Sequence, residues 1–97
     1  MGALLRSDMA WHAKLIKQIV QGQSDANIRF DHLCALLRAL GFEERIRGSH
    51  HLFRRTGVGE RINLQRADGK AKVYQVRQVR AILRKYDWDT LRARGNP

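Results

Sequence analysis

Two adjacent histidines lie among arginines in the segment RGSHHLFRR, which runs from Arg47 to Arg55. A histidine side chain has an unperturbed pKa of about 6.5, so it can accept or donate a proton near neutral pH. RNA cleavage needs both transfers, because the 2′-hydroxyl loses a proton and the leaving 5′-oxygen gains one. Arginines nearby can hold the phosphate and stabilise its developing charge. The segment therefore permits acid/base chemistry on a phosphate-rich partner, alongside a structural role or a metal site.

The two histidines are expected to face opposite ways, because side chains of a strand alternate between its faces. In a strand over 50–55, His51 shares one face with Phe53, and His50 shares the other with Arg54. If Phe53 joins Ile62 in the core, His51 points inward and His50 points outward. His50 is then the candidate catalytic residue, for which a structural role stays equally open. The structural reading is favoured for His51.

A second feature suits a phosphate ligand. The segment GKAKVY brings Lys70 and Lys72 to the start of the last predicted helix, with no Ser, Thr, Asp or Asn immediately before it. Free backbone amides, the helix dipole and two lysines can together hold an anion. A loop made soluble by its lysines is the alternative, and it stays open. A stripe of arginines on that helix is more often solvated surface than a site, though it could extend the same basic surface: Arg77, Arg80 and Arg84.

A metal site is not expected from the spacing of the ligand types. Two adjacent strand residues cannot converge on one ion, and His12 and His32 lie on other predicted elements without HxH or HxxxH spacing. Cys34 is the only cysteine, so it forms no internal disulfide and no CxxC pair. We predict no metal and no other cofactor, and a reduced cytoplasmic protein.

The elements that must position these residues follow from hydrophobic spacing. Met9–Gln21 reads as an amphipathic helix, and a second helix starts at Asp31 as its N-cap and stops at Gly41. The period then changes to that of strands, and a last helix is marked by apolar residues three and four apart. The three predicted strands are 42–47, 50–55 and 60–65, the polar turn is 66–72, and the last helix carries Val76, Val79, Leu83 and Tyr86.

These elements predict one α+β domain over 1–97. Its core spans about 28–86 and has the order α-β-β-β-α, with a three-stranded antiparallel sheet packed by helices on one face. Residues 9–21 form an additional N-terminal helix, and residues 87–97 form a loose basic tail.

Charge limits the class of partner. The 97 residues contain 19 Lys and Arg against 9 Asp and Glu, a formal net charge of +10. Such a chain has affinity for nucleic acid, an acidic membrane surface or an acidic protein. Membrane is the weakest of these, because no apolar run approaches the roughly 20 residues that span a bilayer.

Four motifs in this order resemble the HicA family of toxins: a leucine-rich helix ending in LGF, then GSHH-F, INLQ and GKAKVYQVRQVRAIL. The resemblance covers about Lys14 to Lys85. It implies a fold similar to a double-stranded RNA-binding domain and the activity of an mRNA interferase, a ribonuclease that needs no metal. It also implies that His50, the first histidine of the motif, is catalytic, that Lys70 and Lys72 grip phosphate, and that a HicB antitoxin covers the site. One departure is Val73, where relatives commonly have proline.

The leading hypothesis is therefore an RNA-cleaving toxin of a type II toxin-antitoxin system. Ser49 and His51 are candidates for supporting His50, and Arg54, Lys70, Lys72 and Arg77 are candidates for phosphate contacts. Its partners would be mRNA and a HicB-like antitoxin, with DNA bound only through the antitoxin. The competing hypothesis is an RNA-binding module without catalysis. A DNA-binding regulator is weaker, because no helix-turn-helix spacing appears.

Overall fold

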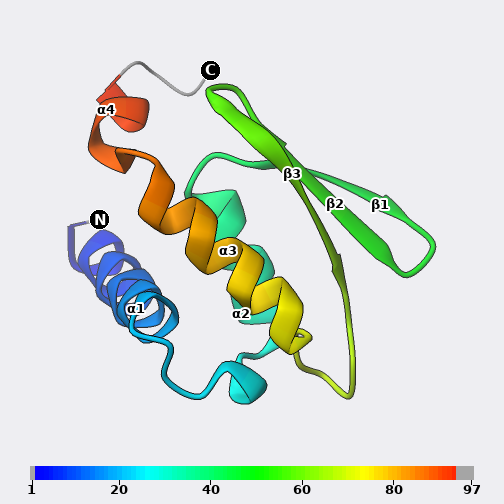
Figure 1. Cartoon of the computed structure of the whole chain (residues 1–97). Coiled ribbons are helices and arrows are strands. Elements are labelled where there is room, and N and C mark those ends of the chain that lie inside the picture. Colours follow the sequence, from blue (N-terminus) through cyan, green and yellow to red (C-terminus); the bar gives the residue numbers. More distant parts are fainter. Residues whose placement is uncertain (1, 94–97) are drawn as a thin grey trace.

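A three-stranded antiparallel sheet with all its helices on one side forms the protein (Figure 1). The computed structural model describes residues 2–93, and it describes side chains for residues 11–91. The α+β prediction is confirmed, including the strand order β1-β2-β3. In chain order the elements are α1 (Gly2–Val20), a 3-10 turn (Asp25–Asn27), α2 (Phe30–Ala39), β1 (Glu43–Arg47), β2 (His50–Arg55), β3 (Val58–Gln65), α3 (Val73–Lys85) and α4 (Trp88–Ala93).

The core lies between the sheet and the helices α2 and α3. Their apolar residues recur three and four positions apart and so lie on one face of each helix. This face meets the inward side chains of β2 and β3, and the burial of each aliphatic side chain stabilises the fold by about 1.5–3 kcal/mol. The most deeply buried residues of this layer are Leu33, Leu36, Leu37, Phe53, Ile62, Leu64, Val76 and Val79.

Helix α1 packs against α3 and begins at Gly2, earlier than the predicted Met9 (Figure 1). Ile19 is fully buried in this contact. Two arginines of α3 bind carbonyls at the C-terminus of α1: Arg80 Nε donates to Ile19 O at 2.7 Å, and Arg84 donates to Val20 O. Arg80 also forms an ion pair with Asp25. These arginines therefore hold α1 in place, where positive charge suits the helix dipole.

Several predicted boundaries are wrong. The residue before α2 is Arg29, so Asp31 is not the N-cap but a first-turn residue whose carboxylate pairs with Arg66 at 2.8 Å. Strand β3 starts at Val58, inside the predicted 57–59 loop.

The tail predicted to be loose contains helix α4 (Trp88–Ala93). Asp87 accepts hydrogen bonds from the Thr90 amide and hydroxyl, and Trp88 Nε1 donates to Leu83 O at 3.1 Å. The rest of that tail, 94–97, lies outside the described residues.

None of the helices that the structure describes is both long enough and apolar enough to cross a bilayer.

Candidate active site

His50 opens β2 directly after a tight turn. Arg47 and His50 are paired across the β1–β2 hairpin, and only Gly48 and Ser49 lie between them. Gly48 has φ 58°, and the first position of a type II′ hairpin turn requires such a positive φ. The turn therefore sets the register that puts His50 on the open face of the sheet. Its side chain is exposed, as the alternation of β2 predicted.

A hydrogen bond orients the His50 imidazole. Its Nδ1 lies 3.2 Å from Oδ1 of Asn63, which projects from β3 on the same face. Because an amide oxygen can only accept, His50 Nδ1 is the donor in this contact, and in the neutral form of the ring the lone pair is then on Nε2. A neutral imidazole held in this tautomer can accept a proton from a group that approaches from solvent.

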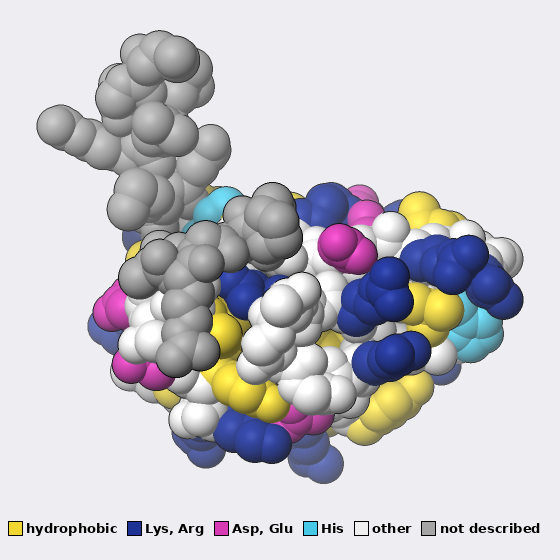
Figure 2. All heavy atoms as spheres, turned by 90° about the horizontal axis from the view of Figure 1, so that it is seen from above, with side chains coloured by type: hydrophobic (Ala, Val, Ile, Leu, Met, Phe, Trp, Pro, Cys, Tyr) yellow, Lys and Arg dark blue, Asp and Glu magenta, His cyan; other side chains and the backbone are white. Residues whose placement is uncertain are grey.

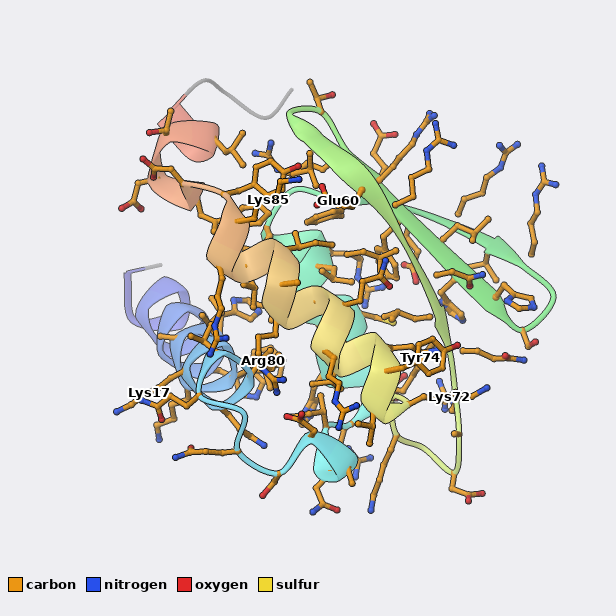
Figure 3. The ribbon with its side chains drawn as sticks, in the orientation of Figure 1. Lys17, Glu60, Lys72, Tyr74, Arg80 and Lys85 are labelled. Carbon is orange, nitrogen blue, oxygen red and sulfur yellow. The ribbon has the colours of Figure 1, made fainter. Side chains whose placement is uncertain are left out.

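A chain of side-chain contacts joins His50's end of the sheet to the start of α3. Gln65 is the cross-strand neighbour of His50 on β3. Its Nε2 donates to Ser49 Oγ at 3.0 Å, and its Oε1 accepts from Lys72 Nζ at 3.4 Å. Figure 3 shows Lys72 where α3 begins, beside β3. Of the predicted site residues, Ser49, His50 and Lys72 are thus brought together, and Gln65 connects them.

The other predicted phosphate contacts lie elsewhere. Lys70 Nζ donates to Asn27 Oδ1 at 3.1 Å. Arg54 shares the open face with His50, but four residues of strand separate them by about 13 Å, and its Nε pairs with Glu43 at 3.5 Å. Arg77 is exposed on α3. Contact of these three residues with phosphate stays a prediction.

His51 points the other way, into the layer between sheet and helices. Its Nδ1 lies 2.7 Å from Glu44 Oε2, and its ring stands edge-on to Phe30 with centroids 4.8 Å apart. Arg38 binds the second oxygen of Glu44 at 2.5 Å. Burial acts to raise the pKa of Glu44, but the hydrogen bonds from His51 and Arg38 outweigh it and hold that pKa below its usual value. These contacts are structural, on the opposite side of the sheet from His50.

One group of possible metal ligands occurs on this inner side, which sequence spacing did not foresee. Atoms of Cys34, Glu44 and His51 lie within 4.8 Å of one another. Burial raises the pKa of the Cys34 thiol to about 11, so the thiol keeps its proton at neutral pH. The thiolate is the form that binds metal. A metal here would have to displace that proton and would still lie behind the sheet from His50.

Sequence reasoning overlooked two arginines of the open face. Arg45 and Arg47 of β1 pair with Leu52 and His50, so they share the outward side. The parity applied to β2 and β3 identifies them once it is extended to β1. Arg61 of β3 is exposed on the same side. Figure 2 shows Lys and Arg side chains gathered at the sheet end of the molecule, on the right of that view.

Comparisons of the chain with protein-family models, with curated proteins and with solved structures found no match. The resemblance to HicA toxins and to double-stranded RNA-binding domains therefore stays a prediction from the motifs.

Proposed function

We propose that the protein is a ribonuclease that cleaves mRNA and acts as the toxin of a type II toxin-antitoxin system. The observation that carries the proposal is His50: it is exposed on a basic face, and Asn63 binds Nδ1 so that Nε2 is free to take a proton. The motif resemblance assigns catalysis to the same residue. The toxin works in the cytoplasm, and its partners are mRNA and a HicB-like antitoxin.

His50 acts first as the general base. Its Nε2 takes the proton of a 2′-hydroxyl, and the resulting oxygen attacks the adjacent phosphorus. The bond to the 5′-oxygen of the next nucleotide then breaks, this oxygen takes a proton from a water, and His50 returns its proton to solvent. The products are a 2′,3′-cyclic phosphate and a 5′-hydroxyl end, and the step needs no oxidant or reductant. Such proton transfers contribute about 100- to 10,000-fold each.

Two cations near His50 can bind the phosphate at which cleavage occurs. Arg47 is the β1 neighbour of His50, and side chains directly opposite in this way have Cβ atoms about 5 Å apart. Lys72 reaches the same end of the sheet from α3 through Gln65. A guanidinium and an ammonium there stabilise the charge that builds up on the phosphate. Ser49 and Gln65 orient this end of the site.

An RNA-binding module without catalysis is the second candidate. It is favoured by the polar neighbours of His50, which are Ser49, Asn63 and Gln65, none of which titrates near neutral pH. A two-proton mechanism needs a second donor, which the substrate or a water would have to supply.

The test is cleavage of a single-stranded RNA by purified wild-type protein, His50→Ala and His51→Ala. We expect His50→Ala to bind RNA, to fold as the wild type does, and to lose at least about 100-fold in cleavage rate. His51→Ala should keep cleavage where it stays folded. A matched oligonucleotide with a single 2′-deoxy position at the cleavage site should resist the wild type. Near wild-type cleavage by His50→Ala, or cutting at the deoxy position, would refute the mechanism.

A further inference from the structure

The open face of the sheet carries a concentration of arginine. The outward positions of β1 hold Arg45 and Arg47, and β2 and β3 add Arg54 and Arg61. One carboxylate, Glu43, lies among these four cations. Figure 3 shows long side chains ending in nitrogen on the side of the sheet away from the helices. This face therefore has a strong positive potential around His50.

Most arginines elsewhere in the described part of the chain are engaged in the fold. In the part of the chain with described side chains, five arginine side chains lack a hydrogen bond or ion pair with another residue: Arg29, Arg45, Arg47, Arg61 and Arg77. Three of these five lie on the open face. On the helix side, Arg38, Arg66, Arg80 and Arg84 each bind a carboxylate or a backbone carbonyl. The guanidinium groups left free are thus concentrated where no helix covers the sheet.

Unpaired like charges on one small face destabilise the fold slightly, and a polyanion would relieve this repulsion. The open face also has a hollow of about 710 Å³ in which part of an RNA strand could lie. Half-buried Leu52 lines this hollow, together with Arg45, Arg54 and Arg61. The open face of the sheet is about 13 Å long from His50 to Arg54, and it is about 10 Å wide between β1 and β3. Modules that bind RNA duplexes span about 16 base pairs, far more than this face. Its size suits a few nucleotides of a single strand.

We propose that single-stranded RNA lies along the open face of the sheet, with Arg45, Arg47 and Arg61 bound to successive phosphates. The inference rests on the proposed function for the chemistry at His50. It adds that the substrate approaches from the side opposite the helices, because the His50 side chain is exposed on that side. Arg47 holds the phosphate next to His50, and Arg45 and Arg61 hold those further along β2.

The test uses a short, fluorescently labelled, single-stranded oligoribonucleotide of mixed sequence. All variants carry His50→Ala so that the RNA stays intact. The sheet variant adds Arg45→Gln, Arg47→Gln and Arg61→Gln. The control variant adds Lys14→Gln, Lys17→Gln and Arg29→Gln, which remove the same charge from exposed positions on the helix side, where Figure 3 labels Lys17. Affinity is measured by fluorescence anisotropy as the salt concentration is varied.

Each phosphate contact to a single strand contributes about 0.7 to the slope of log affinity against log salt. Three lost contacts should therefore lower the slope by about 2 and the affinity by about 100-fold at 0.1 M relative to 1 M salt. The control variant should keep most of the wild-type slope of log affinity against log salt. Amide NMR shifts caused by RNA should lie on β1, β2 and β3 and spare α1. Circular dichroism checks that both variants fold.

Equal losses in the sheet and control variants would show non-specific attraction and overturn the proposal. Tighter binding of the matching duplex, or unchanged RNA binding with loss of an acidic protein partner, would overturn it too. The same arginine substitutions with His50 intact separate the two ideas. If the wild type cleaves RNA and the sheet variant binds and cleaves it equally well, the proposed RNA path along the open face is wrong, but the proposed nuclease activity is retained. If the wild type never cleaves RNA but the sheet variant binds it more weakly, the proposed RNA path is retained and the proposed nuclease activity is wrong.

Discussion

The adjacent histidines show how one peptide bond separates two chemical environments. His50 is exposed and bound only through Nδ1 to Asn63, whereas His51 is wedged between Glu44 and the ring of Phe30. Alternation along β2 was sufficient to predict this difference, because it depends only on which residues of the strand join the core. The partners of each histidine come from β1, β3 and α2, and no local pattern in the sequence indicates them.

The contacts of half-buried Glu44 with His51 and Arg38 on the inner face should make stability sensitive to acid. Hydrogen bonds from His51 and Arg38 prevail over burial and lower the pKa of Glu44 in the folded state. The carboxylate therefore contributes stability that is fully present above its unfolded pKa of about 4.3. That contribution is lost as pH falls through the lower, folded pKa. Urea midpoints should accordingly fall between pH 5 and pH 3.

Glu44→Gln removes this contribution, and its urea midpoint should fall less over the same interval. Glu43→Gln is the matched control, because its side chain is 75% exposed and its pair with Arg54 contributes little. If Glu44→Gln and the wild type lose stability equally on acidification, these contacts of Glu44 are not the source of the acid sensitivity.

At the level of the elements, the two-residue turn between β1 and β2 determines where His50 lies. Gly48 has φ 58°, and a Cβ built there meets nothing within 4 Å, so substitution changes only backbone strain. We expect Gly48→Ala to lower the free energy of unfolding by about 1–2 kcal/mol. Because the strain falls on the turn, cleavage should fall as well. Chemical denaturation and RNA cleavage rates measure the two effects.

Gly59→Ala is the control for that change. Gly59 does not have a positive φ, and the added Cβ would meet only Tyr86 Oη at an ordinary 3.8 Å. This variant should match or exceed the wild type in stability. Equal destabilisation of the two variants would mean that the positive φ of Gly48 has no special role.

Elements with strong apolar periodicity were predicted well, and elements maintained by distant contacts were not. The helix around Leu33, Leu36 and Leu37 and the three strands follow from spacing within each segment. Helix α4 was missed because one of its contacts comes from Arg55, which donates to Leu91 O and lies 36 residues before it in the chain. For the site, parity located His50. The diverging directions of Lys70 and Lys72 depend on Asn27 and Gln65, which the sequence does not connect to them.

For the whole molecule, the two faces of the sheet have separate roles, and this separation bears on metal dependence. The possible ligands Cys34, Glu44 and His51 lie on the inner side, and His50 lies on the outer side. We expect cleavage to survive excess EDTA, because no step at His50 needs an ion. Activity abolished by EDTA and restored by Zn²⁺ would contradict this. If Cys34→Ser also removed that dependence, the inner group would be identified as the site.

If the protein is the proposed toxin, its net charge of +10 and the basic open face predict how an antitoxin would inhibit it. A toxin that acts on cellular RNA must be restrained in the cell that makes it, and an acidic protein would be steered by long-range attraction to the face around His50. There it would exclude phosphate from Arg47 and Lys72. Contacts with half-buried Leu52 would slow its dissociation, because affinity differences lie mostly in that rate. We therefore predict that a HicB-like antitoxin covers the open face.

Competition between RNA and antitoxin for the open face tests this prediction. RNA bound to His50→Ala toxin should be released when antitoxin is added, and the association rate of antitoxin should fall as salt screens the attraction. The sheet variant with Arg45, Arg47 and Arg61 changed to glutamine should associate more slowly, whereas the variant with Lys14, Lys17 and Arg29 changed should associate nearly as fast as the wild type. A ternary complex of toxin, RNA and antitoxin would show that inhibition uses another surface. Helix α1, which packs on α3 away from the sheet, would then be the surface to test.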